Sequence, residues 1–184
     1  GSDRFSEFEN IIGTAKADTF IKNSVSADTV FATYDAGSQV NGTYDVADYS
    51  SATQKIIVTV AGATLTLTDD ADTNGVIDGS ENNDVLSNVE ILKTGSGNDI
   101  YVISSVSGIN TLDAGDGTDS LSLSGTVSLS GVTLLHFENI IVQDGNTATI
   151  SAKELDGKTM AIELQGSGSL VIVGTATNTA ADFD

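Results

Sequence analysis

Six residues that can each supply an oxygen atom to a metal ion occupy fixed positions in the stretch 70–81, DADTNGVIDGSE. Side-chain oxygens stand at positions 1, 3, 5, 9 and 12 of this stretch, and glycine stands at position 6. A loop wraps Ca²⁺ with this spacing, because the glycine permits a sharp turn, the next carbonyl points inward and the final glutamate supplies two oxygens. The predicted calcium ligands here are Asp70, Asp72, Asn74, the carbonyl of Val76, Asp78 and Glu81.

The residues before this loop predict a β-strand, whereas an EF-hand loop is flanked by helices. Residues 64–68 (TLTLT) alternate apolar and polar side chains with the two-residue period of a β-strand. We therefore interpret 70–81 as an EF-hand-like loop in a β protein, where calcium held in this way is structural. The alternative is an acidic surface turn, because Asp, Asn and Gly are also the common residues of turns.

Two further stretches combine glycine and aspartate in a nine-residue pattern, 94–102 (TGSGNDIYV) and 114–122 (AGDGTDSLS). They resemble the nonapeptide of hemolysin-type RTX calcium-binding proteins, except for its first glycine, and 13–21 and 79–87 resemble degenerate copies. The glycines permit tight turns, the aspartate supplies a carboxylate, and the apolar residue two positions later points into the core. This resemblance extends over roughly residues 8–125 and implies a parallel β-roll with calcium at its turns.

The resemblance also implies which residues are ligands, because one ion is held by turns about eighteen residues apart on one edge of the roll. Asp99 and Asp119 are 20 residues apart, so we expect them to share an edge through a two-residue bulge, with Asp113 beside them. A metal-free capping turn is the alternative for both, and it is favoured for Asp18, where Lys16 replaces a glycine. The ligands implied in this part of the chain are Gly97, Asp99, Asp116 and Asp119.

A short internal repeat accompanies these turns. Residues 8–12 (FENII) recur as 137–141 (FENII), and 89–92 (VEIL) are similar. An aspartate follows the first residue of the first two copies by ten positions, whereas Thr147 stands at that position after the third copy. The copies are therefore interpreted as an irregular strand-turn-strand repeat whose third member carries no metal.

Short runs rich in Val, Ile, Leu, Thr and Tyr, separated by Gly, Asp, Asn and Ser, predict an all-β protein. A short helical turn is expected within 151–160. Together with the resemblance, this pattern predicts an elongated right-handed parallel β-solenoid or β-roll with calcium-binding turns. We expect residues 1–125 to form the RTX-like region and 126–184 to continue the same elongated domain. The clearest strands are predicted at 55–60, 64–68, 99–103, 120–124, 139–142, 160–164 and 170–173.

The composition limits the partners of this chain. Its 184 residues include 26 acidic and 7 basic side chains, a formal net charge of −19, which disfavours nucleic acids and anionic membranes as partners. Without cysteine and with the single histidine His136, neither a disulfide nor a zinc site is expected, and His136 is interpreted as a packed or surface residue. No apolar run approaches the 18 residues of a membrane span.

The function expected from these observations is structural and not enzymatic. Self-repulsion among the carboxylates opposes folding unless cations neutralise part of the charge. The resemblance implies a calcium-stabilised segment of a secreted bacterial cell-surface protein, of the surface-layer or adhesin kind, with neighbouring copies or other surface proteins as partners. The alternatives are the noncatalytic tail of a secreted enzyme, a calcium-dependent glycan-binding module and, least favoured, a small hydrolase. Gly1-Ser2 is typical of an expression remnant, so we expect a fragment of a longer protein.

Overall fold

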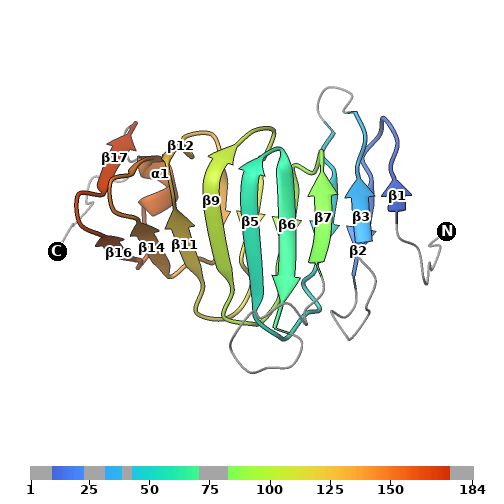
Figure 1. Ribbon diagram of the computed structural model, residues 1–184, viewed down its shortest axis with the longest axis horizontal. Helices are drawn as coiled ribbons and strands as arrows, with labels where there is room; N and C mark the ends of the chain where they lie inside the picture. Colours follow the sequence, from blue (N-terminus) through green and yellow to red (C-terminus); the bar gives the residue numbers. More distant parts are fainter. Residues whose placement is uncertain (1–9, 23–31, 39–42, 71–82, 175–184) are drawn as a thin grey trace.

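The computed structural model of the protein describes residues 10–22, 32–38, 43–70 and 83–174. Within these residues the chain is all-β, as the sequence predicts, and its strands form three sheets in which the strands follow one another along the long axis of the molecule (Figure 1). Every predicted strand is present, with small shifts at its ends. The helical turn expected within 151–160 is α1 (Ala152–Leu155), which begins at the N-cap Ser151.

Sheet A has nine strands, and β1 and β16 lie at its two ends (Figure 1). All its pairs are parallel except those of β6, which is antiparallel to both β5 and β7. The three consecutive strands β5, β6 and β7 are therefore neighbours in this sheet. The order of strands across sheet A is β1 (Asn10–Ile12), β3 (Ala32–Asp35), β7 (Asn83–Ser87), β6 (Thr64–Asp69), β5 (Ile56–Gly62), β9 (Ile100–Val106), β11 (Ser120–Leu123), β14 (Asn139–Val142) and β16 (Ala161–Leu164).

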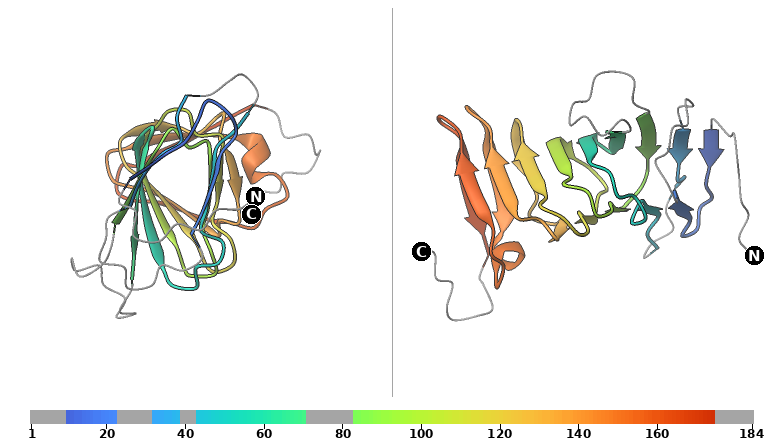
Figure 2. Two further views of the ribbon diagram at one scale, coloured as in Figure 1. Left: turned by 90° about the vertical axis from the view of Figure 1, so that its right-hand side faces the viewer. Right: turned by 90° about the horizontal axis from the view of Figure 1, so that it is seen from below.

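Two smaller parallel sheets complete the described structure, and the chain passes between them and sheet A (Figure 2). We use the word rung for one strand of sheet A together with the residues that follow it until the chain returns to sheet A. Sheet B contains β13 (Thr133–Leu135), β10 (Thr111–Asp113), β8 (Ile91–Lys93), β4 (Val46–Asp48) and β2 (Thr19–Ile21), in that order. Sheet C contains β12 (Thr126–Ser128), β15 (Thr147–Ser151) and β17 (Ser169–Val173).

The core lies between the sheets and is built from rows of side chains that cross many strands. Because side chains alternate between the faces of a strand, each rung adds one or two apolar residues to these rows. Sheet B contributes one row, from Phe20 to Leu134. The longest row crosses all of sheet A and consists of Ile11, Tyr34, Leu86, Leu65, Val60, Ile103, Leu123, Val142 and Leu164.

Such short strands are stable because they stack. A strand of three residues buries one inward side chain, which cannot offset the entropy of ordering it, so each rung depends on its neighbours for a continuous apolar interior. Among the described residues, no helix is long and apolar enough to span a membrane. The rungs also bring together turns that are far apart in the sequence, and these turns carry the acidic residues discussed next.

Candidate metal-binding turns

Acidic residues at the start of the central sheet A strands form a hydrogen-bonded series, which we call the central ladder (Asp99, Asp119 and Glu138). Each carboxylate accepts a hydrogen bond from a backbone N–H of the preceding rung. The Ile56 N–H donates to Asp99 Oδ1 and the Asp99 N–H donates to Asp119 Oδ1, both at 2.7 Å. The Asp119 N–H donates to Glu138 Oε2 at 2.7 Å. The carboxylates therefore fix the register of three successive rungs.

A second series, the N-terminal ladder (Asp18, Asp45 and Glu90), stands at the start of the sheet B strands. The Asp18 N–H donates to Asp45 Oδ1 at 2.6 Å, and the Asp45 N–H donates to Glu90 Oε2 at 2.8 Å. Burial is the largest cause of the raised pKa of Glu90. The sequence analysis did not select Asp45, Glu90 or Glu138 as site residues, although the FENII and VEIL repeats contain both glutamates.

Asp99 and Asp119 lie side by side at the N-terminal ends of two neighbouring strands of sheet A, as their 20-residue spacing predicts. Ile100 pairs with Ser120, which places the two aspartates in neighbouring rungs, and both side chains are fully buried. Within the described part of the chain, neither Asp99 Oδ2 nor Asp119 Oδ2 has a hydrogen-bond partner. A buried carboxylate oxygen without a donor is costly, so each of these atoms calls for a proton or a cation.

The raised pKa of Asp119 also indicates that its carboxylate favours a bound proton or cation. The pKa of this carboxyl is raised from 3.8 to about 7, chiefly by burial and to a smaller extent by the nearby Asp99 and Glu138, against the opposing hydrogen bond from the Asp99 N–H. Burial also raises the pKa of Asp99. A hard cation such as Ca²⁺ favours the ionised form of such carboxylates and supplies the missing partner.

The glycines of the two nonapeptides pack directly on neighbouring backbone. A Cβ atom at Gly115 would lie 2.1 Å from Gly95 O, and one at Gly117 would lie 2.1 Å from Gly97 O and 3.2 Å from Asp119 Oδ1. The Gly97 carbonyl and Asp119 Oδ1 therefore both pack against Gly117. These glycines are needed for the approach of the rungs whether or not a metal is bound, because any side chain would collide with the backbone.

The other predicted ligands are placed differently. Asp116 is exposed, its N–H donates to Gly95 O at 2.9 Å, and Asp113 Oδ1 lies 2.6 Å from His136 Nδ1 instead of joining the central ladder. Asp70 is buried at the end of β6, and its N–H donates to Lys55 O. The remaining predicted ligands of the 70–81 loop lie outside the described residues: Asp72, Asn74, Val76, Asp78 and Glu81.

The described residues limit what a metal site can contain. Within them, no three histidine, cysteine or acidic side chains converge closely enough to hold a metal ion. An ion at Asp99 and Asp119 would therefore need backbone carbonyl oxygens or water to complete its shell. Calcium accepts such mixed oxygen ligands. The two carboxylates with buried unpartnered oxygens thus supply part of the ligand set that calcium prefers.

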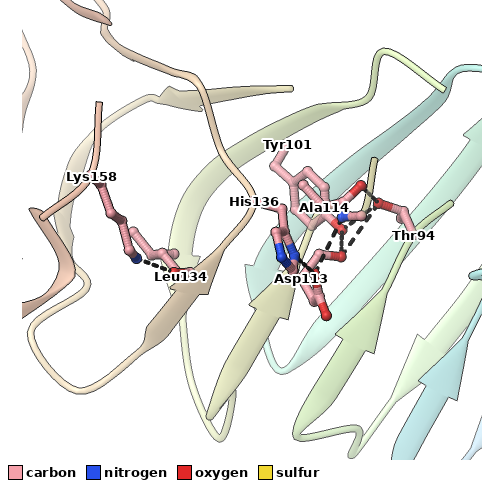
Figure 3. A network of polar contacts seen from close by, with 8 residues as sticks. Thr94, Tyr101, Asp113, Ala114, Leu134, His136 and Lys158 are labelled. Carbon is pink, nitrogen blue, oxygen red and sulfur yellow. Dashed lines mark hydrogen bonds and ion pairs between the residues drawn. The ribbon is translucent and has the colours of Figure 1, made fainter. Parts of the chain in front are cut away.

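A polar network beside the central ladder supports the turns from the interior (Figure 3). The Tyr101 hydroxyl is within hydrogen-bond distance of Thr94 Oγ1 and donates to the Asp113 carbonyl at 3.1 Å, and Thr94 Oγ1 donates to the Ala114 carbonyl at 3.0 Å. His136 is mostly exposed and pairs with Asp113, as expected for a surface histidine. The buried tyrosine and threonine thereby satisfy carbonyls at the end of β10.

Comparisons with protein-family models, with curated proteins and with solved structures found no match.

Proposed function

We propose that this chain is a calcium-stabilised structural β-solenoid segment of a secreted bacterial cell-surface protein. Calcium is held in part by Asp99, Asp119 and the Gly97 carbonyl, and by the 70–81 loop. Its role is to hold acidic rungs together and not to take part in catalysis. The observation that carries the proposal is the fully buried Asp119 carboxylate, whose Oδ2 has no partner among the described residues.

The arrangement of the sheets supports the solenoid part of the proposal. Apart from the two pairs of β6, neighbouring strands of sheets A and B pair in parallel, and each ladder links equivalent positions of neighbouring strands. In a solenoid each unit contacts its neighbours, so long rows of equivalent side chains are expected. The nine-residue row across sheet A has this character. A right-handed coil remains the prediction made from the RTX resemblance.

The charge of the chain supports the calcium part. A formal net charge of −19 opposes compaction, and seven Asp and Glu side chains are buried among the described residues. A cation that binds the folded state and not the unfolded chain stabilises folding by mass action. The resemblance to RTX proteins adds a physiological reason, since calcium is scarce in the cytosol and abundant outside the cell. Export before folding and stiffening afterwards follow from this coupling.

The proposal is tested by thermal unfolding followed by far-UV circular dichroism in chelator, in calcium and in magnesium. At a calcium concentration of about 100 times Kd the expected stabilisation is about 2.7 kcal/mol, which raises the Tm of a chain of this size by roughly 5–10 °C. Magnesium should give a smaller rise, because it demands a smaller and more regular shell. Identical melts in chelator and calcium would contradict the proposal.

Two matched variants locate the effect. Asp119→Asn should remove part of the calcium-dependent rise in Tm, because the amide is a weaker ligand for a hard cation. Asp18→Asn is the control, since it changes an equivalent turn aspartate whose Oδ2 already accepts two hydrogen bonds from Thr14. This control should lower the Tm equally in chelator and calcium. An equal calcium response in the parent and the Asp119→Asn variant would remove Asp119 from the proposed site.

A further inference from the structure

Within the described residues, the interior rows of side chains end at β16 and β17. The inward side chains of β14 and β15 are fully buried, whereas their neighbours one rung further on are 41% (Ile162), 49% (Leu164) and 40% (Ile172) exposed. Among the described residues, β16 has no strand on its outer side. This end therefore offers an unpaired parallel edge and an apolar surface that continues the core.

At the same end of the molecule, the last strand of sheet B is bonded to side chains. Among the described residues, the last strand of sheet A differs in this respect. Beside β13, the Leu134 N–H donates to Glu154 Oε2 at 2.8 Å. Lys158 Nζ donates to the Leu134 carbonyl at 2.5 Å (Figure 3). Glu154 belongs to α1 and is buried. Side chains thus take the place of the next strand in sheet B.

The opposite end of sheet A presents a strand suited to the open edge. In β1, Asn10-Ile11-Ile12 has the same sequence as Asn139-Ile140-Ile141 of β14, and β14 is paired on both of its edges. Among the described residues, β1 is paired on one edge, with β3. Ile11 is partly buried and Ile12 is 78% exposed. The sequence of β1 is thus compatible with strands on both sides.

We propose that copies of this chain associate head to tail, with β1 of one copy pairing in parallel with β16 of the next. Ile11 and Leu164 are the two ends of the row that crosses sheet A, so the same row continues when Leu164 meets Ile11 of the second copy and Glu163 meets its Asn10. Such a contact uses different surfaces on the two partners and does not close, so it extends into filaments. This association goes beyond the proposed calcium function.

Charge sets the condition under which association occurs. Each copy carries a formal net charge of −19, so like-charge repulsion opposes contact at low ionic strength. The apolar contact at the ends is not screened, whereas the repulsion is, because the Debye length falls from about 10 Å at 0.1 M salt to about 3 Å at 1 M. Association should therefore strengthen as sodium chloride is added, opposite to the behaviour of an interface built on ion pairs.

Sedimentation velocity at constant calcium, about 1 mM, tests the proposal. In 1 M sodium chloride, the weight-average mass should rise from one chain at about 1 μM to more than two chains at about 1 mM protein. Leu164→Asp blocks one end and Ile11→Asp blocks the other, so each variant alone should stay monomeric. Mixed in equal amounts, they should form dimers and nothing larger, because one intact head then meets one intact tail.

Tyr44→Asp is the matched control, because Tyr44 is 46% exposed, lies before β4 away from both ends, and acquires the same charge. It should associate like the parent chain. Far-UV circular dichroism checks that each variant is folded, and the behaviour of the parent chain is decisive even if a variant is not. A parent that stays monomeric throughout, or a mixture of the two blocked variants without dimers, would overturn the proposal.

The register is tested separately, because the chain contains no native cysteine. The double variant Asn10→Cys with Glu163→Cys places two cysteines opposite each other in the proposed contact, within the Cα separation that a disulfide requires. Under mild oxidation it should give a ladder of covalent multimers on a non-reducing gel. Ile12→Cys with Glu163→Cys is displaced by two residues and should cross-link less. Equal or preferential cross-linking of the displaced pair would overturn the proposed register.

Discussion

The turn before β2 and the turn before β11 both combine a tightly packed glycine with an aspartate, but the aspartate side chains have different partners. In the first, a Cβ atom at Gly13 would lie 2.5 Å from Ala36 O and 3.0 Å from Asp18 Oδ2. In the second, Gly117 is confined in the same way by Gly97 O and Asp119 Oδ1. Both aspartates also belong to a ladder, because the Asp18 N–H donates to Asp45 Oδ1 and Asp119 Oδ1 accepts from the Asp99 N–H.

The two turns differ in what satisfies the second carboxylate oxygen. Asp18 Oδ2 accepts hydrogen bonds from the Thr14 N–H at 2.6 Å and from the Thr14 hydroxyl at 2.9 Å. Asp119 Oδ2 has no such partner within the described structure, and Asp119 is fully buried. A glycine-aspartate turn therefore does not by itself indicate calcium. The ion is needed where the turn lacks its own donor, and this places the proposed calcium dependence in the central ladder.

The largest expected effect concerns the close packing that both turns share. At Gly95 a Cβ atom would lie 1.8 Å from Ala52 O, so Gly95→Ala must push two rungs apart. We expect a loss of about 2–4 kcal/mol in the free energy of unfolding, measured by urea denaturation. Gly131→Ala is the control, because a Cβ atom there meets nothing within 4 Å and is expected to change stability by less than about 0.5 kcal/mol. Equal effects of the two substitutions would contradict this account of the turn.

A smaller effect separates the tyrosines of the two regions. The buried Tyr101 hydroxyl bonds to Thr94 and to the Asp113 carbonyl, so Tyr101→Phe should cost about 1–2 kcal/mol of stability. The Tyr34 hydroxyl is buried beside the N-terminal ladder without a hydrogen-bond partner among the described residues. Burial, followed by Asp45 and Asp18, raises the pKa of Tyr34 to about 12.

Tyr34→Phe should therefore leave stability unchanged or raise it by up to about 1 kcal/mol, because it removes an unsatisfied buried hydroxyl. Urea unfolding of the two variants side by side measures the difference. A larger loss for Tyr34→Phe than for Tyr101→Phe would show that the Tyr34 hydroxyl is satisfied after all, and would weaken the contrast between the regions.

A further effect is a pH dependence specific to the central ladder. In chelator, the pKa of Asp119 is about 7 in the folded protein against an ordinary 3.8, so the folded state holds a proton that the unfolded state has lost between these values. The contribution of this group to stability is present below pH 4 and is lost as the pH rises through 7. Saturating calcium should reverse the slope, because the ion binds the ionised carboxylate.

Comparison of the parent with Asp119→Asn isolates this contribution from other titrating groups. In chelator, the difference in unfolding free energy between the two proteins should shrink in magnitude or change sign as the pH rises from 4 to 7. A difference that does not vary over this range would show that Asp119 titrates normally in the folded chain.

Parts of this architecture could be predicted from particular residues. The alternation in 64–68 predicts β6, and the 20-residue spacing of Asp99 and Asp119 predicts their common edge. Most strands of sheet B escaped prediction because three-residue strands such as β4 and β10 contain one inward side chain each, too few to show a period of two. The donors to Asp99 and Asp119 are backbone N–H groups, which leave no signature in a sequence.

By itself, the sequence determines the all-β class, the acidic character and the glycine-aspartate turns, because these depend on local period, charge and backbone freedom. The tertiary structure decides which turn aspartates keep an unsatisfied oxygen, since donors such as the Ile56 N–H come from rungs 43 residues away. It also decides that β6 runs antiparallel and that sheet B is closed by Glu154 and Lys158 while sheet A stays open. These outcomes depend on long-range register, which local preference does not specify.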